Sequence, residues 1–201
     1  MRKGVRVPGV FALLLAGVLP ALAATETFTF DRAHSLIGFR IRHVVTKVEG
    51  RFKGFTGTIW LDRANPGASK VELTIQAASI DTGVEDRDKD LRSPNFFDVE
   101  KYPTITFKST KVEARDNDSY EVTGDFTLHG VTKTIRVPVK HTGFGKLGDV
   151  EKAGFEVALP LSRKEYGIDR GAPLLGDDVE INIQVESNKQ SSEESKAPAK
   201  S

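Results

Sequence analysis

The stretch VEINIQV, Val179–Val185, alternates an apolar residue with a polar one at every step. Successive side chains of a β-strand point to opposite faces, so this period of two indicates a strand with one buried and one wet face. Similar stretches recur from Phe28 onward. They number eight or nine, each roughly 7 to 11 residues long, with turn sequences such as Asn65–Gly67 between them. Their close spacing predicts an all-β, antiparallel domain, for which a barrel is favoured over a β-sandwich.

The two ends of the chain differ from this pattern. Residues 1–23 have a basic start, an apolar stretch broken by Pro20 and a small-x-small ending, which is typical of a signal peptide. The apolar stretch is shorter than the roughly 20 residues of a membrane span, so we expect cleavage and no stable membrane insertion afterwards. Residues 187–201 are rich in Ser, Lys and Glu and are expected to form a disordered tail. One domain, residues 25–186, remains.

Composition excludes several classes of function. The chain has no cysteine, which removes thiol nucleophiles, disulfides and Cys-ligated zinc. A net charge of +1 provides no basic field for nucleic acid. The four histidines lack the spacing of a metal-binding pair, and the acidic run Asp86–Asp90 lacks the glycine and glutamate of a calcium loop. No nucleophile–base set is recognisable, so we expect neither catalytic residues nor a metal site.

The inward-facing positions combine large rings with glycines. The chain has 12 phenylalanines, and several glycines lie within or beside the strand patterns. Such a mixture could form a tightly packed core, or it could line a long apolar pocket. Periodicity alone does not separate these two arrangements.

One loop carries two adjacent phenylalanines, which would have nothing to bury against on an ordinary surface. Phe96 and Phe97 follow the only stretch with a helical pattern, residues 83–92, and lie between Pro94 and Pro103. We expect this loop to fold over one end of the barrel with the rings facing the interior. The rings would then act either as a lid over a ligand or as a plug of the core, and both alternatives stay open.

Several stretches together resemble the YceI-like family. They are an Asp-x-x-His-Ser element, a Gly-x-Phe-x-x-Phe-x-Gly element, a long segment that includes the double-phenylalanine loop, and two later strands. Together they cover the domain from Phe28 to Val185. The matching stretches are FDRAHSLIGFRIRHVVTKVEGRFKGFTGTIWLD, SIDTGVEDRDKDLRSPNFFDVEKYPTITFKST, GDFTLHGVTKTI and LSRKEYGI.

The resemblance implies an extended, eight-stranded, lipocalin-like antiparallel barrel with one short helix, exported to the bacterial periplasm. It further implies a long isoprenoid or fatty-acyl chain inside the barrel and no metal or redox cofactor. The expected apolar lining and lid consist of Phe39, Phe52, Phe55, Leu91, Phe96, Phe97, Ile105, Phe107, Phe126 and Phe155. The polar residues expected at the mouth, where they would hold a head group, are His34, Arg87, Asp88, Arg92 and Arg163. A homodimer is compatible with these features.

Three functions follow from this reading. The first is a carrier of long-chain apolar lipid, because such a ligand needs many apolar contacts and few polar ones. The second is a lipid-modifying enzyme that uses His34 or His43 with an aspartate. The third is an envelope scaffold or stress module whose barrel is filled by side chains. The carrier is the favoured hypothesis, and the interior volume of the barrel distinguishes it from the scaffold.

Overall fold

The computed structural model describes residues 25–116 and 118–191. The expected signal peptide lies outside the described residues, as do residues 192–201 of the expected tail. The boundary at residue 187 is wrong, because the last strand continues to Lys189 and Ser187 is completely buried within it. The Ser187 hydroxyl donates a hydrogen bond of 2.8 Å to the carbonyl of Ala153. A serine that is satisfied in this way can occupy a buried strand position, which composition does not reveal.

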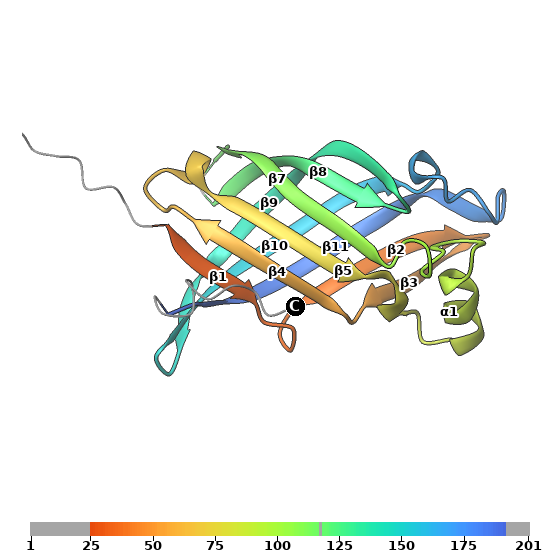
Figure 1. Ribbon diagram of the computed structural model, residues 1–201, viewed down its shortest axis with the longest axis horizontal. Helices are drawn as coiled ribbons and strands as arrows, with labels where there is room; N and C mark the ends of the chain where they lie inside the picture. The colour runs from red at the N-terminus through yellow and green to blue at the C-terminus, as the bar shows by residue number, and fades with distance from the viewer. Residues whose placement is uncertain (1–24, 117, 192–201) are drawn as a thin grey trace, which may run out of the picture.

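Eight antiparallel strands form a closed ring, which confirms the predicted all-β barrel (Figure 1). The ring closes because the first strand pairs with the fourth along one edge and with the last along the other. Around the ring the strands are β1 (Glu26–Phe30), β4 (Phe55–Leu61), β5 (Lys70–Gln76), β7 (Thr104–Ala114), β8 (Ser119–Leu128), β9 (Val131–Leu147), β10 (Val150–Ser162) and β11 (Leu175–Lys189).

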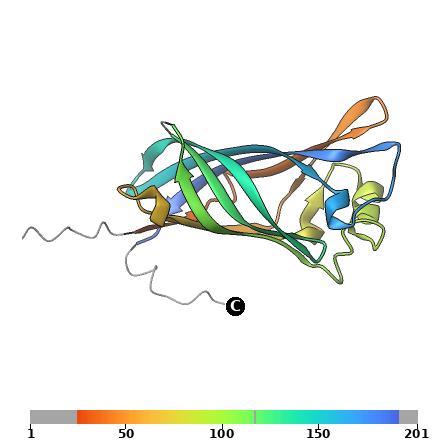
Figure 2. The same ribbon diagram turned by 90° about the horizontal axis from the view of Figure 1, so that it is seen from above.

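The remaining elements, except the 3-10 turn between β4 and β5, gather at one end of this ring, called the α1 end (Figures 1 and 2). The hairpin β2–β3 extends the sheet from β11, and the short strand β6 pairs with β3. These elements are β2 (Leu36–His43), β3 (Thr46–Phe52), β6 (Ile80–Asp81), α1 (Glu85–Arg92) and the 3-10 turns η2 (Ala77–Ser79) and η3 (Lys164–Tyr166). The 3-10 turn η1 (Pro66–Ala68) lies at the opposite end, between β4 and β5 (Figure 1). Within the described residues α1 is the single α-helix, as predicted. None of the described helices is long and apolar enough to cross a lipid bilayer.

The ladder between β9 and β10 ends part of the way along the barrel. Its last pair joins Val139 to Val157, while β9 continues along β8 and β10 continues along β11. Pro138 and Pro160 lie beyond this point, where each strand pairs with only one neighbour. A proline there interrupts no ladder on the open side, which explains why two prolines are tolerated in long strands.

Buried apolar side chains form two clusters, one at each end of the barrel. The larger cluster lies at the α1 end and includes Ile37, Phe52, Phe55, Ile75, Ile80, Ile105, Tyr166 and Ile168. Phe96 and Phe97 pack against it, and the Phe97 ring meets Phe52 edge to face at 5.7 Å between centroids. The smaller cluster, at the opposite end, consists of Phe28, Ile59 and Ala153 with their neighbours. The double-phenylalanine loop therefore covers the α1 end and is anchored in the core there.

Glycines allow phenylalanine rings to lie against the barrel wall. At three positions a Cβ added to the glycine would lie 2.3 to 2.6 Å from ring carbons, far inside van der Waals contact. The ring thus occupies the space that a side chain on the neighbouring strand would take. The pairs are Gly50 with Phe39, Gly57 with Phe30 and Gly124 with Phe107.

Candidate ligand-binding cavity

An apolar cavity of about 540 Å³ lies inside the barrel between the two buried clusters. Volumes of this size are typical of small-molecule sites. The inward residues of the middle section are only partly buried, because they face this space rather than one another. They come from every long strand and include Phe107, Ile135, Val139, Val157, Leu159 and Ile181. A side-chain-filled barrel is therefore not what this sequence builds.

The structure brings nearly all the predicted apolar residues to the cavity. Phe39, Phe52, Leu91, Phe96, Phe97, Ile105, Phe107, Phe126 and Phe155 line it. Phe55 lies outside the lining, because it is 4% exposed and packs within the cluster at the α1 end. The aliphatic residues of β9, β10 and β11 were absent from the predicted lining. Their inward positions in the alternating pattern are the signal that could have identified them.

The cavity opens toward the α1 end. Lining residues that are also exposed mark where a cavity reaches solvent, and four of them, His43, Asp90, Gly171 and Leu174, belong to elements at this end. Among the described residues, one exposed lining residue, Lys70, lies at the opposite end. The mouth therefore lies between α1, the tip of the β2–β3 hairpin and the loop that precedes β11.

Two of the predicted polar residues form a small network at α1. The Arg87 guanidinium donates to the hydroxyl of Thr82 at 2.7 Å and to its carbonyl at 2.8 Å. Asp88 is 6% exposed, and its carboxylate accepts hydrogen bonds from the Thr82 backbone N–H at 2.9 Å and hydroxyl at 2.5 Å. Arg87 and Thr82 line the cavity, whereas Asp88 does not. The network attaches α1 to β6 and holds Arg87 at the cavity wall.

The other two predicted arginines hold backbone carbonyls. Arg92 donates to the carbonyls of Ala78 and Ile80, both at 2.8 Å, and does not line the cavity. Arg163 lines the cavity but is 5% exposed. Its guanidinium donates to the carbonyls of Gly176 at 2.7 Å, Ile168 at 2.8 Å and Arg170 at 2.7 Å.

Burial lowers the pKa of Arg163, although the nearby carboxylates of Asp177 and Asp169 act in the opposite direction. A charge held this deep is tolerated because its donors are satisfied. The segment held by Arg163 leads to Gly171 and Leu174 at the mouth. Arg163 therefore shapes the mouth through the backbone of this loop.

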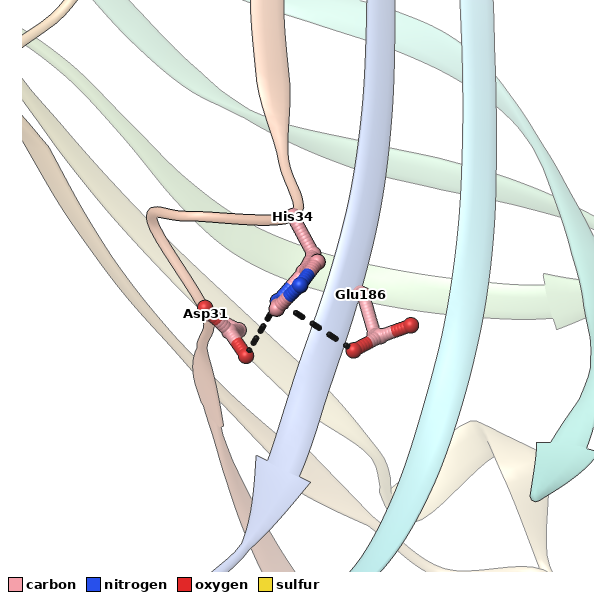
Figure 3. A group of neighbouring side chains, drawn as sticks. All are labelled: Asp31, His34 and Glu186. Carbon is pink, nitrogen blue, oxygen red and sulfur yellow. Dashed lines mark hydrogen bonds and ion pairs between the residues drawn. The ribbon is translucent and has the colours of Figure 1, made fainter. Parts of the chain in front are cut away.

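His34 lies at the corner between β1 and β2, outside the cavity lining. Its Nδ1 is 3.0 Å from the Asp31 carboxylate and 3.7 Å from that of Glu186, as Figure 3 shows. Ligand atoms of these three residues lie within 4.8 Å of one another, a spacing that could hold a metal ion. The Lys152 ammonium, however, is 3.2 Å from Asp31 and 2.6 Å from Glu186. It already supplies a cation to both carboxylates.

The same contacts change the acidity of the corner. The hydrogen bond from His34, followed by that from Lys152, holds the pKa of Asp31 well below its ordinary value, although partial burial opposes them. The carboxylate thus stays ionised within an ion-pair network. This arrangement ties the first strand to β10 and β11, which gives Asp31 and His34 of the Asp-x-x-His-Ser element a structural role.

A closed antiparallel barrel around an apolar cavity with one main mouth defines a class of small barrels that can enclose a single ligand, as lipocalins do. Residues 28–187 match the YceI-like domain. The chain belongs to the YceI-like family.

Similar proteins support this assignment over most of their length. A UPF0312 protein of Pectobacterium atrosepticum is 39% identical over 180 residues, which cover 88% of this chain and 93% of that protein. The crystal structure of BcnA from Burkholderia cenocepacia superposes with a TM-score of 0.73 at 26% identity, covering 78% of this chain and 98% of BcnA. A polyisoprenoid binding domain from Saccharophagus degradans has a TM-score of 0.62 over 83% of this chain and 99% of that domain. At 16% identity the last likeness shows the fold alone.

Proposed function

We propose that this protein is an exported binding protein that holds a long-chain apolar lipid, of polyisoprenoid or fatty-acyl type, inside the barrel. The observation that carries the proposal is the cavity of about 540 Å³, whose walls are almost entirely aliphatic and aromatic. Membership in the YceI-like family and a shared fold with a polyisoprenoid binding domain support this ligand class. In this proposal the ligand is held without a metal or redox cofactor.

Apolar burial alone provides enough affinity for such a ligand. Each buried methylene contributes about 0.8 kcal/mol, so ten methylenes in the cavity contribute about 8 kcal/mol before the entropic cost of binding. A polar head group then needs only a few partners at the mouth. Arg87 lies there with its guanidinium already oriented by Thr82.

Binding is favoured over catalysis because of where the histidines lie. His34 sits in the ion-pair network at the β1–β2 corner, away from the cavity. His43 reaches the mouth, but no hydrogen bond joins it to a carboxylate among the described residues. A general base needs both a position beside the ligand and a partner that orients it. Neither of these two histidines meets both requirements.

Native mass spectrometry of the protein purified from its own host tests this proposal, with two variants that place the same ring on opposite faces of β10. Val157→Trp fills the cavity, whereas Ala158→Trp points outward from the same strand. We expect wild type and Ala158→Trp to carry lipid, and Val157→Trp to be folded and empty. Leu159→Trp provides a second inward variant should Val157→Trp not fold. Wild-type protein that is empty and takes up neither isoprenoid quinones nor fatty acids would refute the proposal.

Export is the second part of the proposal and has its own test. The basic and apolar pattern of residues 1–23 supports a cleaved signal peptide and a periplasmic location. Cell fractionation combined with the intact mass of the purified chain checks this directly. We expect a periplasmic protein that begins after Ala23, and a cytoplasmic chain of full mass would contradict export.

A further inference from the structure

The β2–β3 hairpin turns through two valines. His43 pairs with Thr46, so Val44 and Val45 form the two-residue turn between them. Val44 has a φ of 52°, a left-handed conformation that β-branched residues rarely adopt, and such turns usually carry glycine or asparagine. The Val45 side chain is 94% exposed and that of Val44 is 47% exposed. Neither turn geometry nor core packing explains this pair, and strain of this kind often marks a functional position.

A third exposed apolar side chain stands beside this turn. Leu174, in the loop before β11, is 58% exposed, and its carbonyl accepts a hydrogen bond of 2.8 Å from the Val44 backbone N–H. The Arg42 guanidinium joins both segments, with hydrogen bonds to the carbonyls of Val44 at 3.0 Å and Pro173 at 3.5 Å. Figures 1 and 2 show the hairpin and this loop projecting together from the α1 end. Val44, Val45 and Leu174 form what we call the docking tip.

The docking tip borders the cavity mouth. Leu174 belongs both to the tip and to the cavity lining, and His43, next to Val44 in the chain, also lines the cavity and is exposed. An apolar surface thus continues from the tip into the interior of the barrel. A chain that left an apolar environment at the tip would pass into the cavity with little contact with water.

Basic residues flank the tip on the hairpin. They are Arg40, Arg42 and Lys47, of which Arg40 pairs with Glu49 and Glu180 and Lys47 pairs with Glu180. These five charged residues leave the hairpin with an excess of one positive charge. Exposed apolar side chains on a surface with a small positive excess fit the boundary between the acyl chains and the anionic head groups of a bilayer. A protein partner fits less well, because the surface that three side chains offer is far smaller than the roughly 1,200 Å² that a stable protein interface buries.

We propose that the docking tip inserts reversibly into the surface of a lipid bilayer, so that the cavity mouth faces the membrane from which the apolar chain is taken. Contact is shallow and is made by the tip alone. The transfer step rests on the proposed lipid-binding function, whereas the docking step does not.

Vesicle flotation of the full chain tests the docking step, using vesicles of phosphatidylethanolamine and phosphatidylglycerol. The double variant Val44→Gly with Val45→Ser removes both exposed valines and places glycine at the left-handed position. Its vesicle binding should fall about tenfold or more, because two apolar side chains are lost from the membrane contact. Its unfolding midpoint should be unchanged or higher, because the strain is relieved. Loss of binding in a more stable fold separates docking from structural damage.

Leu147→Ser is the matched control, because Leu147 is 67% exposed on the hairpin at the opposite end of the barrel. It should bind vesicles like wild type, with the same amino-terminal residue confirmed by mass in every sample. Wild type that does not float with vesicles would overturn the proposal. A double variant that binds normally, or a Leu147→Ser variant that loses as much binding, would overturn it as well.

Uptake of a soluble fluorescent fatty acid, delivered without vesicles, is measured in parallel. The double variant should take up this probe normally, because neither valine lines the cavity, and should load more slowly from vesicles. Absence of probe uptake in wild type would instead refute lipid binding and leave the flotation result to be judged separately.

Discussion

Substitution of Gly57 by alanine tests how the cavity is kept open. A Cβ at this position would lie 2.6 Å from two carbons of the Phe30 ring, and the three nearest atoms all belong to that ring. Carbon atoms normally approach to about 3.5 Å, so the ring must move by about 1 Å. Phe30 lines the cavity and packs against both buried clusters, so its displacement should strain the wall and narrow the cavity.

The expected cost follows from two opposing effects. Overpacking destabilises a well-packed site by about 1–3 kcal/mol, whereas replacing glycine by alanine stabilises by about 0.4–1 kcal/mol through the unfolded chain. Gly57→Ala should therefore lower the free energy of unfolding by about 1–2 kcal/mol. In a Phe30→Leu background the ring is absent, and the same substitution should be neutral or slightly stabilising. The coupling energy between Gly57 and Phe30 should be about 1–3 kcal/mol.

Urea unfolding of wild type, both single variants and the double variant measures this coupling. The denaturant slope must stay constant across the four proteins for the comparison to report native-state contacts. A cost for Gly57→Ala that is equal in both backgrounds would show that the ring is not what the added methyl meets. The explanation of the cavity by rings lying over glycines would then fail for this pair.

Three further predictions concern the α1 end. Arg163→Met should destabilise the fold by about 3 kcal/mol or more in urea unfolding, because three backbone carbonyls lose a buried charged donor, and an unchanged midpoint would contradict this role. Phe96→Ala and Phe97→Ala should each lower the free energy of unfolding by about 2–3 kcal/mol in thermal unfolding, with or without lipid, because both rings pack against the core. If the rings acted only as a lid, the variants would instead lose bound lipid while their stability stayed constant. The hydrogen bond from Lys53 is the main cause that lowers the pKa of Asp81 to about 2, below the ordinary value near 3.9. The stabilisation of the fold by ionised Asp81 is therefore complete above about pH 4 and is lost as the pH falls through about 2. Asp81→Asn should flatten the dependence of the urea midpoint on pH in this window, and an unaltered dependence would refute the assignment.

Alternation predicted most of the strands and their inward faces, although not their number or their lengths. It works because a barrel has one interior, so every strand must place its apolar residues on the same side. Val179, Ile181, Ile183 and Val185 obey this rule and all line the cavity. The apolar lining was therefore largely predictable from the residues themselves.

The roles of the polar residues were not predictable in the same way. Long side chains such as Arg92 and Arg163 reach carbonyls that the fold brings close, and residue type alone does not specify those carbonyls. Asp88 resembles a solvated helix residue in the sequence, yet it is 6% exposed and bound to Thr82. Helix α1 is short, so its packing against β6 decides which of its charges are buried. That packing is tertiary information.

The hollow interior and the docking tip are connected through the register of one hairpin. In a two-residue hairpin the turn fixes the register, so a turn at Val44–Val45 places Phe39 opposite Gly50. The Phe39 ring lies over that glycine, against the wall of the cavity that it lines. A sequence with Asn-Gly at this turn would have revealed both the turn and the pairing. Valines occupy the turn instead, and because valine is not a turn-forming residue, the sequence does not indicate the turn or the register. In our proposal these valines contact lipid, which explains why they occupy a turn that disfavours them.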